Sequence, residues 1–240
     1  MSGGELFGQV KCAIVTIDLG HSDRFRDIFS VRFDVMSTAV GLAGKALETY
    51  PAGSFVHTNR LPGTTAAATS AIKRAHKRGD LVPIRRGLYF KGVRTRYGMT
   101  RPSPEAIAAE VLGKTGAGPT GFSAARAFGL TTQVPAKPTM VVTGAVPTSI
   151  PGVKISKRNN IRRAALRPLE IAVLELLRGD WETTVDGGWN AMSTAVGQAL
   201  TAGKLRWSKL TAAAEGERSP ALRDNLIRLS EDLRASGMLA

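Results

Sequence analysis

The spacing of hydrophobic positions predicts the order of helices and strands along this chain. Between Met36 and residue 100, the pattern favours a helix, a short strand, a short helix, a longer helix and a hairpin. The longer helix covers residues 64–78, in which Ala68, Ile72 and Ala75 recur at positions i, i+4 and i+7. These three side chains are therefore expected to face a hydrophobic core.

The hairpin is predicted from two short extended runs that follow this helix. Residues 81–84 and 88–90 are rich in strand-forming side chains, and Arg85, Arg86 and Gly87 join them. A helical pair followed by a hairpin with a basic tip is typical of a winged helix-turn-helix, whose second helix enters the major groove of DNA. We therefore expect a winged helix-turn-helix DNA-binding domain over residues 36–100.

The chain from 101 to 240 has a different and mainly helical pattern. Ser103 precedes a predicted helix as its N-cap, and residues 138–143 and 153–155 are extended runs. Further helices are expected to begin at Pro168, Trp189, Ser208 and Pro220. The expected fold class is α+β: an N-terminal winged helix-turn-helix followed by a mixed α/β, mainly helical C-terminal domain over residues 101–240.

Residues 1–35 have no sustained hydrophobic period, and Met36 is followed at once by a helix-start pattern. Two interpretations follow from this change. Residues 1–35 are either an extension upstream of a native start at Met36 or a genuine N-terminal arm.

The composition is that of a globular protein, and the positive charge favours a polyanionic partner, either nucleic acid or an anionic membrane surface. The 240 residues are 43% hydrophobic and 22% charged, and 33 Lys and Arg against 19 Asp and Glu give a net charge of +14. No run of 18 apolar residues indicates a membrane span, and no signal-peptide pattern opens the chain. The single cysteine, Cys12, excludes an internal disulfide and a multi-cysteine metal site. We expect a cytoplasmic protein that does not contact membranes.

The positive charge is concentrated in two blocks. Residues 57–101 hold eleven basic side chains and one acidic side chain, Asp80, and thus account for +10 of the total. Within this block, the candidate DNA-binding residues are those at the front of the longer helix, along its exposed face and on the wing: Thr64, Thr65, Thr69, Lys73, Arg74, Lys77, Arg85, Arg86 and Lys91. A second basic patch is expected from Lys154, Lys157, Arg158, Arg162 and Arg163.

Catalytic and cofactor motifs are missing from the sequence. Its three histidines, His21, His57 and His76, do not have metal-ligand spacing. The run Gly113-Lys114-Thr115 resembles the end of a phosphate-binding loop, but Ala108 stands where that motif needs glycine. We therefore expect a protein that is not an enzyme and binds no metal or cofactor.

Two segments resemble the AbiEi-type antitoxins of type IV toxin–antitoxin systems. Residues 70–89 read SAIKRAHKRGDLVPIRRGLY, similar to the winged-helix signature of that family, and residues 120–130 read TGFSAARAFGL, similar to the short helix that follows the wing. The resemblance covers about residues 36–180. It implies a bacterial protein that represses its own operon by binding operator DNA and whose C-terminal domain counteracts a nucleotidyltransferase-like toxin.

By the same resemblance, the side chains that face DNA would be Thr65, Thr69, Lys73, Lys77, Arg85 and Arg86. Two alternatives stay open. One is a stand-alone winged-helix transcriptional regulator without a toxin. The other is a protein or RNA interaction module that does not bind an operator.

Overall fold

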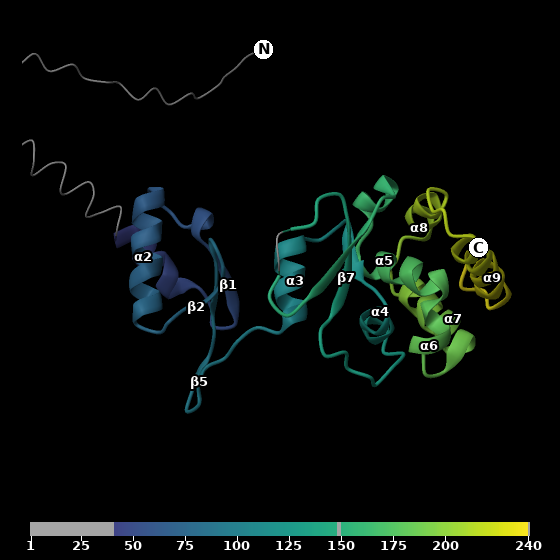
Figure 1. The fold of residues 1–240 in the computed structure, drawn as a ribbon, viewed down its shortest axis with the longest axis horizontal. Coiled ribbons are helices and arrows are strands. Elements are labelled where there is room, and N and C mark those ends of the chain that lie inside the picture. The colour runs from purple at the N-terminus through teal and green to yellow at the C-terminus, as the bar shows by residue number, and fades with distance from the viewer. Residues whose placement is uncertain (1–40, 148–149, 240) are drawn as a thin grey trace, which may run out of the picture.

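The structure of the protein is a computed structural model that describes residues 41–147 and 150–239. It has a mixed α+β fold, with helices and small sheets in the N-terminal part and mainly helices in the C-terminal part (Figure 1). This agrees with the expected fold class. The predicted extension over residues 1–35 and the predicted helix start at Met36 lie outside the described residues.

The N-terminal part has the topology of a winged helix. A helix over 41–49 is followed by β1 (Ser54–His57), the 3-10 helix η1 (Thr58–Arg60), α2 (Thr65–Lys77), β2 (Val82–Arg85) and β3 (Leu88–Lys91). The three strands form an antiparallel sheet in the order β1-β3-β2. Ala68, Ile72 and Ala75 are buried with the helix over 41–49, as their spacing predicts.

A second hairpin follows the wing. Strands β4 (Arg94–Thr95) and β5 (Gly98–Met99) pair with each other in an antiparallel ribbon that projects from the winged helix (Figure 1). The hydrophobic pattern does not predict this hairpin, because its strands have two residues each and none of their side chains is buried.

The C-terminal part combines one small sheet with many helices. Its elements are α3 (Pro104–Leu112), β6 (Ala117–Pro119), α4 (Phe122–Ala127), β7 (Thr139–Thr143), β8 (Lys154–Arg158), η2 (Ile161–Ala165), α5 (Pro168–Glu175), the π-helical turn η3 (Leu176–Asp180), α6 (Trp181–Thr184), α7 (Gly188–Thr201), α8 (Trp207–Ala214) and α9 (Pro220–Ala235). The sheet order is β6-β7-β8, with β6 antiparallel and β8 parallel to β7. Ser103 caps α3 by accepting a hydrogen bond from the amide of Ala106 at 3.1 Å.

Each part has its own hydrophobic cluster. One cluster lies within residues 43–89, and the other lies within residues 124–239, where α5, α7, α8 and α9 bury most of its side chains. The boundary between the two domains at residue 100 stays a prediction. Among the described helices, none is long and apolar enough to cross a membrane.

Candidate nucleic-acid interface

Helix α2 presents a polar stripe on the face opposite its buried side. Thr65, Thr69, Lys73 and Lys77 recur every four residues, and all four are exposed. Residues three or four apart lie on the same face of a helix, so these side chains form one continuous row. The row runs from two short hydroxyl side chains at the front of the helix to two flexible cations at its end.

The hydroxyl groups at the start of α2 are held by the helix itself. Thr64 is the N-cap, and its Oγ1 accepts a hydrogen bond from the amide of Ala67 at 3.2 Å. The hydroxyl of Thr69 donates to the carbonyl oxygen of Thr65 at 2.8 Å. The hydroxyl proton of Thr64 and the lone pairs of Thr69 therefore stay available to an external partner such as a phosphate or a base edge.

The wing places two exposed arginines beside the first turn of α2. Arg85 and Arg86 end β2 and open the turn, which Gly87 completes with a φ of 78°, a value that glycine adopts without strain. The carbonyl of Gly87 accepts a hydrogen bond from the amide of Thr58 at 3.0 Å. This bond fixes the wing tip against η1, so a groove of about 610 Å³ forms between the start of α2 and the wing.

The groove also contains one carboxylate, from α3. Glu110 Oε1 lies 2.5 Å from His57 Nε2 and 3.8 Å from Arg60 Nη1. These two pairs could not be predicted from the sequence, because about fifty residues separate Glu110 from both partners. Along α2 itself, residues 64–79 contain no Asp or Glu. The exposed stripe therefore carries no negative charge of its own, and its positive charge comes from Lys73 and Lys77. Its neighbouring cations are Arg74 on the helix and Arg85 and Arg86 on the wing.

Lys91 does not belong to this surface, which corrects the sequence-based assignment. Its Nζ donates hydrogen bonds to the carbonyl oxygens of Leu47, Glu48 and Tyr50, at 2.8, 3.0 and 2.6 Å. These carbonyls lie at and just beyond the end of the helix over 41–49, where backbone acceptors have no partner in the helix and where a cation is favourable. All three N–H groups of Lys91 are used in capping that helix, so none is left for a phosphate.

The second basic patch is also corrected in part. Lys154 and Lys157 are exposed on β8, and within the described residues they form no salt bridge. Arg162 is exposed but paired with Glu215. The guanidinium groups of Arg158 and Arg163 turn inward, where they bind carboxylates of the helical core. The five cations of the second basic patch therefore do not form a continuous positive surface.

Arg163 is the centre of a buried ion-pair network. Its side chain is fully buried, its Nη1 lies 2.5 Å from Glu175 Oε1, and its Nε lies 2.6 Å from Glu217 Oε1. Arg158 binds the same Glu175 through Nε at 3.0 Å and Nη2 at 2.5 Å, while Arg178 binds Glu217 at 2.9 Å. Glu175 at the end of α5 and Glu217 in the loop after α8 thus bind three arginines, one each from β8, η2 and η3.

The pKa of Glu175 depends on two opposing effects, its burial and its contacts with arginines. Burial acts to raise the pKa, but hydrogen bonds and charge attraction from Arg158 and Arg163 outweigh it and lower the pKa below its ordinary value. Glu170 behaves in the same way: burial opposes ionisation, and the hydrogen bonds that Arg206 and the backbone donate lower its pKa. Both glutamates are charged structural groups of the core.

No metal site was found in the part of the chain that the structure describes, where no group of three or more His, Cys, Asp and Glu side chains could hold an ion. Cys12 and His21 lie outside the described residues.

Comparisons with known proteins give a similarity in structure but none in sequence. No family model matches this chain, and no curated protein matches it. Among solved structures, the chain is similar to the crystal structure of the RV2827C protein from Mycobacterium tuberculosis. That similarity has a TM-score of 0.43 and 13% sequence identity, and it covers 84% of this chain and 80% of that one.

Proposed function

We propose that this protein binds duplex DNA with α2 in the major groove and with the wing on the adjacent backbone or minor groove. One observation carries the proposal: Thr65, Thr69, Lys73 and Lys77 form an exposed row without carboxylates on the second helix of a winged helix-turn-helix. A row of this kind matches the way such helices meet DNA, with the front of the helix toward base edges and the cations toward phosphates.

The side chains of the row differ in the part of DNA that each would contact. Lys73 and Lys77 are flexible point charges that suit phosphate oxygens and carry little sequence information. Thr65 and Thr69 are short and lie at the front of the helix, where hydroxyl groups bond to either a base or a phosphate. Arg86 at the wing tip is placed for a narrow minor groove. Few base contacts combined with DNA shape would set the specificity.

We further propose that this DNA binding serves an antitoxin-like transcriptional regulator without enzymatic activity. Support comes from the resemblance of residues 70–89 and 120–130 to AbiEi-type antitoxins, which implies repression of the protein's own operon and a nucleotidyltransferase-like toxin as partner. A neighbouring reading frame that encodes such a toxin would support the antitoxin role. Without one, the protein is a stand-alone regulator.

Binding to DNA is tested by salt titration with a fluorescent duplex from the protein's own promoter. Five exposed cations, Lys73, Arg74, Lys77, Arg85 and Arg86, predict that log K falls with log salt at a slope of about −4.5. Affinity would then fall roughly 500-fold between about 50 and 200 mM salt. The Lys73→Ala/Lys77→Ala variant should bind more weakly, with a slope reduced to about −2.7.

Lys154→Ala/Lys157→Ala is the matched control, because it removes two exposed lysines from β8. It should leave both the affinity and the slope unchanged. Equal losses in the two double variants would show that total charge, rather than α2, governs binding. A wild-type protein that does not bind duplex DNA, or whose binding is insensitive to salt, would overturn the proposal and favour an interaction module for protein or RNA.

A further inference from the structure

The hairpin of β4 and β5 is not part of the helix-turn-helix and wing, yet it is strongly basic. Residues 92–101 include Arg94, Arg96 and Arg101 and no acidic side chain. Its tip consists of Arg96 and Tyr97, both exposed. None of these residues belongs to the hydrophobic clusters of the fold. The hairpin is therefore a candidate binding surface for a negatively charged partner.

The hairpin is an ordered element that its own hydrogen bonds hold. The amide of Val93 donates to Thr100 Oγ1 at 2.8 Å, and the amide of Thr100 donates to the carbonyl of Val93 at 2.9 Å. Near the tip, the hydroxyl of Thr95 donates to the carbonyl of Gly98 at 2.8 Å. The tip is therefore presented on a defined ribbon, so less conformational entropy is lost when it meets a partner.

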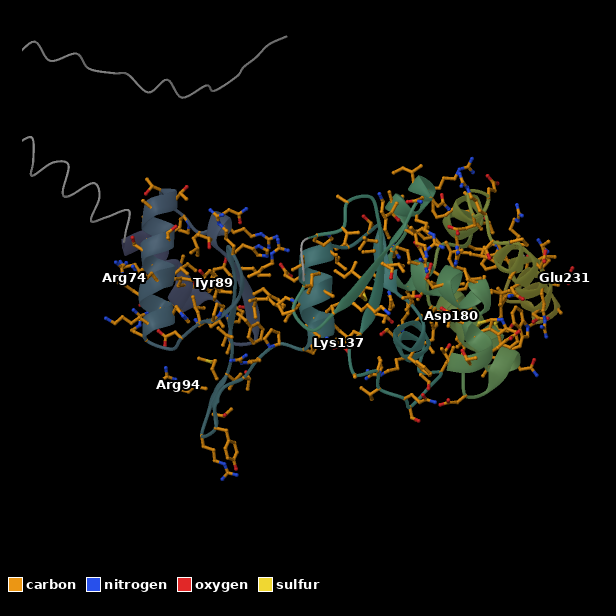
Figure 2. All side chains as sticks on the ribbon, viewed as in Figure 1. Arg74, Tyr89, Arg94, Lys137, Asp180 and Glu231 are labelled. Carbon is orange, nitrogen blue, oxygen red and sulfur yellow. The ribbon has the colours of Figure 1, made fainter. Side chains whose placement is uncertain are left out.

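The base of the hairpin lies at the C-terminal end of α2. Arg94 Nη2 contacts both the carbonyl of Arg78, the C-cap of α2, and Asp80 Oδ1, each at 3.3 Å. Arg78 Nε donates to the other oxygen of Asp80 at 2.8 Å. Figure 2 shows Arg74 on α2 and Arg94 both pointing away from the C-terminal part of the protein. The wing thus flanks one end of α2, and this hairpin flanks the other.

The tip of the hairpin combines a cation with an aromatic ring. The guanidinium carbon of Arg96 lies 4.6 Å from the centroid of the Tyr97 ring, and Tyr97 is 85% exposed. Arginine suits phosphate oxygens, and an aromatic ring packs against sugars and bases in nucleic-acid complexes. An acidic protein surface would also attract the arginines, but the position beside α2 favours the same duplex.

We propose that the hairpin of β4 and β5 is a second DNA-binding arm. Arg96 contacts a phosphate, and the ring of Tyr97 packs against the sugar-phosphate edge of the groove beyond the C-terminal end of α2. This inference rests on the proposed function, because α2 brings the duplex within reach. Duplex DNA would then be held on both sides of the recognition helix, by the wing at its start and by this hairpin at its end.

The test uses the full chain, the same promoter duplex and two single variants. With Arg96 as a sixth phosphate contact, the wild-type salt slope becomes about −5.4 instead of about −4.5. Arg96→Ala should weaken binding roughly 8-fold at about 0.1 M salt and return the slope to about −4.5, because one fewer counterion is released. Tyr97→Ala should weaken binding without changing the slope, because the ring carries no charge. Tyr97→Phe should bind like the wild type. Arg218→Ala, at an exposed arginine between α8 and α9, is the matched control and should have no effect.

The helix variant separates the two proposals. If Lys73→Ala/Lys77→Ala weakens binding while Arg96→Ala and Tyr97→Ala bind like the wild type, the hairpin is not a DNA-binding arm and the proposed function stands. If the wild type does not bind duplex DNA, both proposals fall. Hydroxyl-radical footprints give a second readout: protection should shorten at one end of the site in the Tyr97→Ala complex, and an unchanged footprint would contradict the proposed arm.

Discussion

Replacement of the buried Arg163 should strongly destabilise the C-terminal part of the protein. In Arg163→Met, Glu175 keeps Arg158 and Glu217 keeps Arg178, but two carboxylates that are at most 3% exposed each lose one of their charged partners. Removal of one member of a buried ion pair costs about 3–5 kcal/mol when the charge left behind has no other partner. Because each carboxylate keeps one arginine here, we expect a loss at the lower end of that range, about 3 kcal/mol. Whole domains are stable by about 5–15 kcal/mol, so this single change would remove a large share of the stability.

Tryptophan fluorescence during urea unfolding measures this loss in the relevant part of the chain. All the tryptophans of the protein, Trp181, Trp189 and Trp207, lie in the C-terminal part. The matched control is Arg162→Met, which breaks an exposed ion pair with Glu215 and should cost less than about 1 kcal/mol. If Arg163→Met costs no more than Arg162→Met, the buried ion-pair network contributes no net stability, which would contradict this prediction.

Two further predictions concern charged groups with structural roles. The pKa values of Glu170 and Glu175 are lowered in the folded protein. These two carboxylates therefore stabilise the fold above their unfolded pKa of about 4.3, and this stabilisation is lost as pH falls through their folded pKa values. Burial raises the pKa of Asp180, so the effect of that carboxyl on stability changes with pH in the opposite direction. Urea midpoints between about pH 7 and 3 should therefore fall on acidification, and a flat profile would argue against the lowered values. Lys91→Met should cost about 1.5–3 kcal/mol in thermal unfolding followed by far-ultraviolet circular dichroism, because charge-assisted bonds to three carbonyls are lost, yet it should keep the salt slope of DNA binding. A shallower salt slope in this variant would indicate that Lys91 contacts DNA after all.

The local pattern of the sequence predicts much of the winged helix. The spacing of Ala68, Ile72 and Ala75 gives the buried face of α2, and the opposite face follows from the same period. Gly87 in the wing turn and Ser103 at the start of α3 are recognisable because a turn and a helix start each need particular residue types. These features depend on neighbours a few residues apart.

Features that depend on distant partners could not be predicted in this way. Arg163 stands in a local run of cations, and only the fold brings Glu217, 54 residues later, to its guanidinium. Lys91 faces the helix over 41–49, more than forty residues earlier. A run of basic residues therefore predicts a positive surface only where no carboxylate from a distant part of the chain pairs with it. Among the described residues, Lys73 and Lys77 on α2 form no salt bridge.

Site-directed cleavage of DNA tests most directly whether α2 enters the major groove. With Cys12→Ser removing the only native cysteine, Ser70→Cys places a single thiol on the exposed face of α2, beside Thr69 and Lys73. An iron chelate attached there should cut a promoter duplex within a few base pairs on each strand, at one position in the protected site. The same chelate at Lys154→Cys on β8 should cut weakly and without a preferred position. If the Ser70→Cys conjugate cuts no more sharply than the Lys154→Cys conjugate, α2 is not in the groove.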